Sequence, residues 1–203
     1  MALKPSHRPF VISGSPDSPR TLEFFYCFVC THSARSAETL ETVVKPLLEE
    51  KYPNQVKVIF RPQVQPWWPS SSIVHEASLA VAHVAPTKWW SYALALFRNR
   101  TSFTDIPTSS LTPVQLRSKL ADFGHEQGIL SEEETQKVKE LLTLKPGGGL
   151  GWVTDELKYS LKYSRQNSVH FSPTVLFDGL IVSDVQSSWG SKEWSNFFST
   201  RLD

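Results

Sequence analysis

The sequence has few cysteines, no long apolar run and almost no net charge. Its 203 residues include only two cysteines, and 21 Lys and Arg balance 20 Asp and Glu to a net charge of +1. Such a balance provides no electrostatic footprint for nucleic acid or an anionic membrane, so neither is expected as a partner. No run approaches the ~20 apolar residues of a membrane span, and the start, MALKPSHRPF, lacks the apolar stretch of a secretory signal. We therefore expect a cytoplasmic protein with free thiols.

The first third of the chain predicts a strand, a helix and a second strand. Residues 21–29, TLEFFYCFV, are apolar on both alternation faces, which is typical of a strand covered on both sides. Apolar residues recur every three to four positions in residues 33–52 and predict a helix, which Pro46 should kink or break. Residues 55–60, QVKVIF, alternate as a strand does. This order predicts a parallel βαβ unit.

The middle of the chain, residues 71–145, reads as all-helical and interrupts the βαβ topology. Ser72 is a plausible N-cap for its first helix. Thr112-Pro113 opens a later helix that Gly124 should close, and Ser131 with Glu134 matches a capping box. We interpret this region as a helical insertion.

The last part of the chain returns to mixed structure. The segment KPGGGLG, residues 145–151, predicts a linker, and residues 153–165 predict a helix. Asp178-Gly179 between two short apolar runs is the signal of a tight β-hairpin, and residues 192–202 predict a final helix. Together the elements predict one α/β domain over residues 1–203, with a core from 20–65 and 150–203 and an insertion over 71–145.

Both cysteines lie in YCFVCTHS, which can be read in two frames. In the first, Cys27 and Cys30 form a C-x-x-C dithiol. If the segment is extended, their Cα atoms are roughly 10 Å apart, whereas a disulfide accepts up to about 7 Å. The pair could be bridged only if the strand ended early in a turn, and Phe28 and Val29 are poor turn formers. This frame favours Cys27 as an inert core residue; a dithiol enzyme needs the strand to end before Cys27.

In the second frame, CTHS, Cys30 stands where the strand meets the helix. The first-turn N–H groups and the positive end of the helix dipole favour a thiolate there. His32 could add positive charge, and Ser33, one helical turn on, could hydrogen-bond the sulfur. The alternative is that Cys30 merely occupies a helix start, and the local sequence leaves the two interpretations level.

Two motifs resemble the DsbA-like group of the thioredoxin superfamily. The segment FFYCFVCTHS resembles its aromatic strand running into C/S-P-x-C/S, with Cys30-Thr31-His32-Ser33 in place of the motif. Downstream, FSPTVLFDG, residues 171–179, resembles the segment that carries the cis-proline of this fold. The group includes DsbA-type oxidoreductases, kappa-class glutathione transferases and 2-hydroxychromene-2-carboxylate isomerases. The resemblance spans residues 20–200 and implies a thioredoxin-like fold with an inserted helical subdomain.

The resemblance also implies roles for individual residues. Cys30 would be the nucleophile or would activate glutathione as a cosubstrate, with Ser33 and His32 beside it. Thr31, Ser172 and the cis residue Pro173 would face the substrate. Three departures bear on activity: Thr31 replaces the usual proline, Ser33 replaces the resolving cysteine, and Cys27 stands where the isomerase branch often has an acid.

Other candidate residues are weaker. Trp67-Trp68 follow the second strand and could wall a substrate pocket, or could anchor the insertion on the sheet. The histidines have no ligand cluster around them, so no metal site is expected.

Two functions from different classes follow. The first is a thiol-dependent oxidoreductase, or a glutathione-dependent transferase or isomerase, that uses one cysteine on a small thiol or disulfide or on a protein thiol. The second is a non-catalytic thioredoxin-fold module that binds a peptide or protein partner along the cis-proline groove. A homodimer is possible for relatives of the kappa class.

Overall fold

A mixed sheet of five strands forms the centre of the described chain. The computed structural model describes residues 3–147 and 150–203. Its strands are β1 (Val11–Ser13), β2 (Arg20–Tyr26), β3 (Val56–Pro62), β4 (Thr174–Phe177) and β5 (Leu180–Ile181). Their order is β1-β3-β2-β4-β5, and β2 runs parallel to β3 but antiparallel to β4. The predicted parallel βαβ unit is therefore confirmed.

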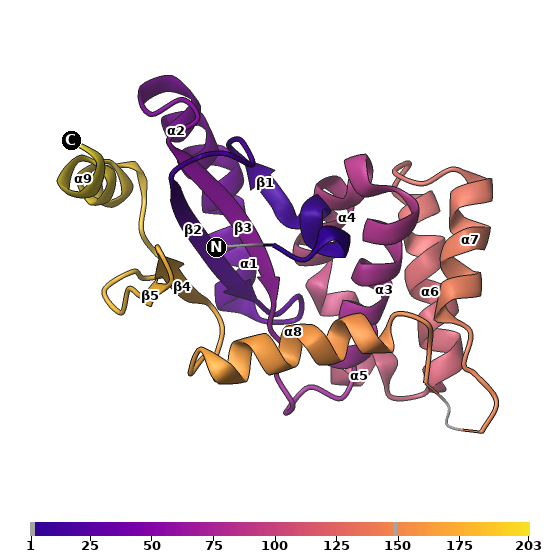
Figure 1. Ribbon diagram of the computed structural model, residues 1–203. Helices are drawn as coiled ribbons and strands as arrows, with labels where there is room; N and C mark the ends of the chain where they lie inside the picture. The colour runs from indigo at the N-terminus through magenta and orange to yellow at the C-terminus, as the bar shows by residue number, and fades with distance from the viewer. Residues whose placement is uncertain (1–2, 148–149) are drawn as a thin grey trace.

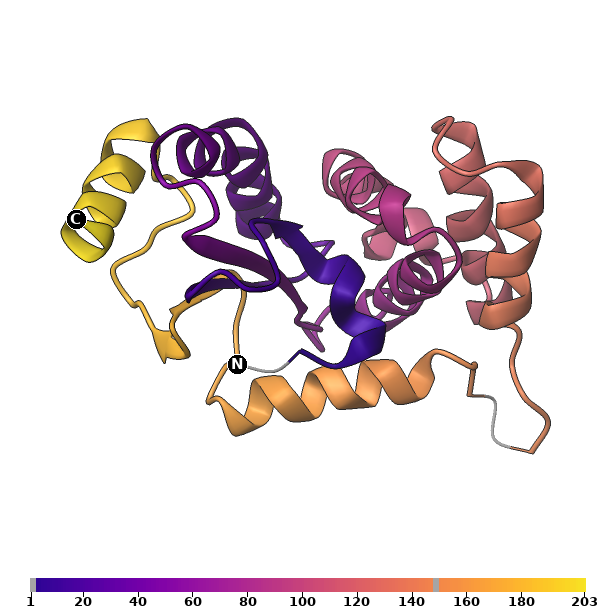
Figure 2. The same cartoon turned by 45° about the horizontal axis from the view of Figure 1, so that its top comes forward.

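Helices lie on both sides of the sheet and in a separate group beside it (Figures 1 and 2). The helices are α1 (Thr31–Thr39), α2 (Lys45–Lys51), α3 (Ser71–Val84), α4 (Trp89–Arg98), α5 (Asp105–Thr108), α6 (Pro113–Glu126), α7 (Glu132–Leu142), α8 (Thr154–Gln166) and α9 (Ser191–Leu202). In Figure 1 the group α3–α7 lies to one side of the sheet and α9 to the other. The α8 helix leads back from the group and contacts both α3 and β3.

Both faces of β2 are buried, as its apolar pattern predicts. On one face Phe24 and Tyr26 join the main core with Phe60 of β3. On the other face Phe25 stacks on Tyr163 of α8, with ring centroids 6.1 Å apart and planes at 3°. A strand covered on both sides holds its ends rigidly, which matters because Cys30 follows β2 by four residues.

The helix after β2 is divided near Pro46, as expected. The α1 helix ends at Thr39, a π-helical segment spans Leu40–Val44, and α2 begins at Lys45. Proline has no backbone N–H, so the hydrogen-bond pattern must change in the turn before it, and the π-helical segment lies at that position.

The caps of the inserted helices agree with the sequence, with two corrections. Capping boxes form at Thr112 and at Ser131. The first helix begins at Ser71, one residue before the predicted cap Ser72. Gly124 does not close α6, which continues to Glu126. Its role is packing, since a Cβ at Gly124 would lie 2.6 Å from Leu130 Cδ1.

The C-terminal elements match their predictions. Asp178 (φ 50°) and Gly179 (φ 82°) form the tight turn between β4 and β5. Of the linker predicted over residues 145–151, Gly148 and Gly149 lie outside the described residues, as do residues 1–2 of the predicted domain. Within residues 3–147 and 150–203, no helix is both long and apolar enough to cross a membrane.

Candidate active site

The segment CFVC is a tight turn and not the end of a strand. The β2 strand stops at Tyr26, and the Cys30 N–H donates to Cys27 O at 3.1 Å. The expectation that residues 21–29 form one strand is therefore wrong at its last three positions. Residues i and i+3 of such a turn have Cα atoms less than about 7 Å apart. The two cysteines are thus much closer than the roughly 10 Å of an extended segment.

Packing explains why poor turn formers occupy this turn. Phe28 is buried, and its ring centroid lies 4.9 Å from that of Phe97, 4.8 Å from that of His75 and 5.3 Å from that of Phe60. Burial of a Phe side chain is worth about 1.5–3 kcal/mol, which exceeds a local turn preference. Strand pairing also ends here, because Tyr26 is paired with Pro62, the last residue of β3.

Cys30 lies at the start of α1 and beside the proline loop. It is the N-cap residue with extended backbone, and its carbonyl accepts the Ala34 N–H at 3.0 Å. The Ser172–Pro173 bond is cis, as the resemblance implies, and the Cys30 thiol contacts Ser172 O at 3.5 Å. Two motifs separated by more than 140 residues therefore meet at one sulfur atom. Cys30 is 5% exposed, so only a small part of the residue reaches the surface.

Cys27 is the first residue of the turn, and polar groups contact its sulfur. Its side chain is buried, and its sulfur is 3.3 Å from Ser71 Oγ at the start of α3. Burial raises the pKa of the Cys27 thiol, and hydrogen bonds from Ser71 and from the backbone of Val29 and Gln65 oppose that rise. Cys27 is a core residue, as the sequence suggests, but its sulfur is not surrounded only by apolar atoms.

Ser33, His32 and Thr31 take different positions on the first turn of α1. Ser33 is buried, and its hydroxyl accepts the Cys27 N–H at 3.3 Å. In the described chain no hydrogen bond joins Ser33 Oγ to the Cys30 sulfur, contrary to the expectation. His32 and Thr31 are exposed, and His32 Nδ1 lies 3.3 Å from Ser187 Oγ in the loop before α9. Their roles toward a substrate stay predictions.

Trp67 and Trp68 lie in the loop after β3, with ring centroids 5.8 Å apart. Because β2 and β3 are parallel, this loop and Cys30 share one end of the sheet. Trp68 packs partly against the core, whereas Trp67 is 59% exposed. Trp68 thus has an anchoring contact and Trp67 is free to meet a ligand, while their place in a substrate pocket stays a prediction.

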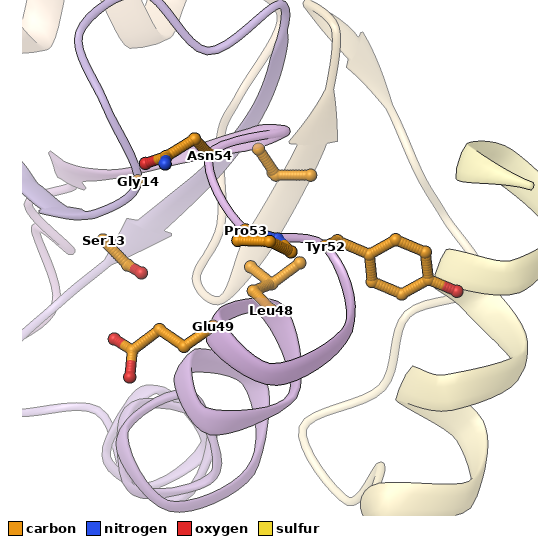
Figure 3. A pocket seen from close by; sticks show the side chains of 8 residues that line it. Ser13, Gly14, Leu48, Glu49, Tyr52, Pro53 and Asn54 are labelled. Carbon is orange, nitrogen blue, oxygen red and sulfur yellow. The ribbon is translucent and has the colours of Figure 1, made fainter.

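A surface hollow of about 290 Å³ lies at the opposite end of the sheet. Leu48, Tyr52 and Pro53 line it together with Val56 (Figure 3). Val56 pairs with Arg20, the first residue of β2, whereas Cys30 follows the last. The hollow is therefore separate from the cysteine site. Within the described residues, no group of three or more His, Cys, Asp or Glu side chains could hold a metal ion.

Two contacts of the site carried no signal in the sequence. Ser71 approaches Cys27 only because α3 begins below the turn, and Ser187 approaches His32 only because the chain folds back before α9. Each of these serines has other serines beside it in the sequence, and no local pattern shows which one contacts the site. Their places depend on tertiary packing and not on local pattern.

The fold matches solved structures of thiol-disulfide oxidoreductases. A candidate protein-disulfide isomerase of Pseudomonas syringae has a TM-score of 0.69 and 22% identity, with 89% of this chain and 93% of that chain covered. BdbD of Bacillus subtilis, in its oxidised form, has a TM-score of 0.64 and 14% identity, with 95% of this chain and 92% of that chain covered. MdbA of Corynebacterium diphtheriae, a thiol-disulfide oxidoreductase, has a TM-score of 0.63 and 20% identity, with 90% of this chain and 86% of that chain covered. No protein-family model and no curated protein matches the sequence.

These likenesses confirm the fold that the two motifs imply. The chain has a DsbA-like thioredoxin fold with an inserted helical region, and the match extends over about nine-tenths of its length. At these identities the likeness concerns the fold alone, so the activity must be argued from the cysteines and their surroundings.

Proposed function

We propose that this protein catalyses thiol-disulfide exchange, with Cys30 as the nucleophile. The observation that supports this most is the placement of the Cys30 sulfur at a helix N-terminus, 3.5 Å from the carbonyl that precedes cis-Pro173. A thiol-disulfide exchange needs a sulfur that can attack in line with a substrate disulfide. It also needs a surface that holds the substrate chain, and the loop around Ser172 would provide backbone groups for it.

The substrate would be a small disulfide or a protein disulfide, with glutathione as the cosubstrate. Exposed aromatic side chains near the motifs suit an apolar portion of such a substrate: Phe171, directly before Ser172, is 52% exposed, and Trp67 is 59% exposed. The Cys30 thiolate would attack the disulfide of the substrate or of oxidised glutathione, form a mixed disulfide and release one thiolate; the thiol of reduced glutathione would then attack the mixed disulfide and free Cys30. Ser172 and Pro173 would contact its peptide backbone.

Adduct mapping tests this function. The folded protein is exposed to oxidised glutathione, quenched in acid and digested, and the cysteine peptides are weighed. We expect glutathione on the Cys30 peptide in a Cys27→Ser variant and none in a Cys30→Ser variant. An unmodified Cys30 in folded protein, with full modification only after unfolding, would refute the proposal. That result would favour the alternative of a non-catalytic module that binds a peptide along the Ser172–Pro173 loop.

A further inference from the structure

The turn that carries Cys30 also carries a second thiol. Cys27 and Cys30 are its first and fourth residues, joined by the backbone hydrogen bond of 3.1 Å. Cα atoms less than about 7 Å apart lie within the span that a disulfide can close. Both cysteines are free in this structure. Closing the bond requires the Cys30 sulfur to leave Ser172 O and the Cys27 sulfur to leave Ser71 Oγ.

Hydrogen-bond donors surround the Cys27 sulfur. The Ser71 hydroxyl lies 3.3 Å from it, and the backbone of Val29 and Gln65 also bonds it. These contacts stabilise the charged form, whereas burial and a charge on Cys30 both raise the pKa of Cys27. When Cys30 is held in a mixed disulfide it has no charge, so one of the two effects that raise the Cys27 pKa disappears. Cys27 therefore ionises more readily when a mixed disulfide awaits release.

Ser33 cannot supply the second thiol, but it positions the first residue of the turn. Its hydroxyl accepts the Cys27 N–H at 3.3 Å, which ties the start of the turn to the first turn of α1. The residue one helical turn after Cys30 thus holds the backbone of Cys27 in place. A serine hydroxyl does not resolve a mixed disulfide as a thiolate does. A resolving thiol close to Cys30 in the chain must therefore lie before it, between the end of β2 and Cys30.

We propose that Cys27 is the resolving thiol for Cys30, placed before the nucleophile in the chain and not after it. This inference rests on the proposed function. The Cys30 thiolate attacks a substrate disulfide R–S–S–R′, forms Cys30–S–S–R and releases R′–S⁻. The Cys27 thiolate then attacks the Cys30 sulfur, forms the Cys27–Cys30 disulfide and releases R–S⁻. The protons of the two protein thiols end on R–SH and R′–SH, and two electrons pass from the cysteine pair to the substrate. Two molecules of a thiol reductant such as glutathione restore the pair.

The test follows the mixed disulfide over time. Equal amounts of wild-type protein and of the Cys27→Ser and Cys30→Ser variants react with oxidised glutathione, and samples are quenched in acid for intact mass. We expect the Cys27→Ser variant to keep a stable adduct on Cys30. The wild type should lose its adduct roughly tenfold faster or more and end about 2 Da lighter than the reduced protein, with the two cysteine peptides linked. A Cys27→Ala variant should behave as Cys27→Ser does.

A matched control tests whether the missing thiol is the cause. Ser33→Cys in the Cys27→Ser background puts a sulfur on the helix side, and we expect adduct release to return. A wild-type adduct as long-lived as that of Cys27→Ser would overturn the inference and leave the proposed function standing. Absence of any adduct on Cys30 in every variant would overturn both.

Discussion

At the scale of single residues, burial decides what the local pattern leaves open. Phe28 and Val29 disfavour a turn by their intrinsic preferences, yet both are buried within one. The transfer of two apolar side chains into the core outweighs the preference of the backbone. The sequence shows the two cysteines and the helix start, but the distance between the cysteines depends on this burial. That distance decides whether Cys27 is an inert core residue or can react with Cys30.

His75 links the turn to the acid stability of the protein. Its ring packs against Phe28, and burial lowers its pKa from 6.5 to about 3. In the unfolded chain His75 therefore binds a proton near pH 6.5, whereas in the folded protein it binds one only near pH 3. The contribution of His75 to stability is fully present above pH 6.5 and is lost as the pH falls toward about pH 3. Acidification thus destabilises the folded protein through a histidine that packs against the turn of residues 27–30.

A His75→Leu substitution tests this linkage. Between about pH 7.5 and about pH 5, protonation of His75 in the unfolded chain should lower the unfolding free energy of the wild type by about 2 kcal/mol. The variant lacks this histidine, so its unfolding free energy should fall by about 2 kcal/mol less over the same range. Urea denaturation at several pH values measures both. The window lies above the range where carboxylates titrate, so they contribute little to the difference. Parallel pH profiles for the two proteins would contradict the prediction.

At the scale of elements, the two capping boxes could be predicted from the sequence, and short elements could not. Thr112 and Ser131 each accept the N–H of the residue three positions on, as their patterns predict. By contrast, β1 has only three residues and pairs antiparallel with β3 through an irregular register. No periodicity can show in three residues, so the sequence did not predict it. The π-helical segment before Pro46 likewise depends on how the chain absorbs a lost hydrogen bond, and the sequence indicates only that one is lost.

The cap at Thr112 is a measurable part of the inserted region. Thr112→Ala removes the acceptor for the Gln115 N–H and should destabilise the protein by about 1 kcal/mol. Thr112→Ser keeps the hydroxyl and should change stability by much less. Chemical denaturation of the three proteins gives the comparison. Equal losses for alanine and serine would show that the side-chain hydroxyl does not cap α6.

At the scale of the whole molecule, a buried ion pair within the sheet also receives a hydrogen bond from the returning helix α8. Arg61 of β3 donates to Glu23 of β2 at 2.6 Å, with side chains 5% and 0% exposed. Tyr163 of α8 donates to the same carboxylate at 3.1 Å, and burial raises the pKa of Tyr163 to about 12. The contact ties α8, which follows the helical insertion, to the strand that leads to Cys30.

Removing one member of this pair should affect stability strongly. Arg61→Met leaves the Glu23 carboxylate buried without its cation and should cost about 3–5 kcal/mol. The matched control is Arg98→Met, which breaks an exposed pair with Glu38 and should cost less than about 1 kcal/mol. Unfolding free energies from denaturant curves distinguish the two. A similar small loss in both variants would mean that the buried pair of Arg61 and Glu23 contributes little to stability.

The most direct test of the account is the turnover of a small disulfide. The rate at which the protein reduces hydroxyethyl disulfide at the expense of glutathione is measured for the wild type and for Cys30→Ser, at matched folded concentration. We predict a rate above the uncatalysed reaction for the wild type and a fall of at least about 100-fold in kcat/KM for the variant. Equal rates for the two proteins, or no rate above background for the wild type with any disulfide tried, would contradict Cys30 as the catalytic nucleophile.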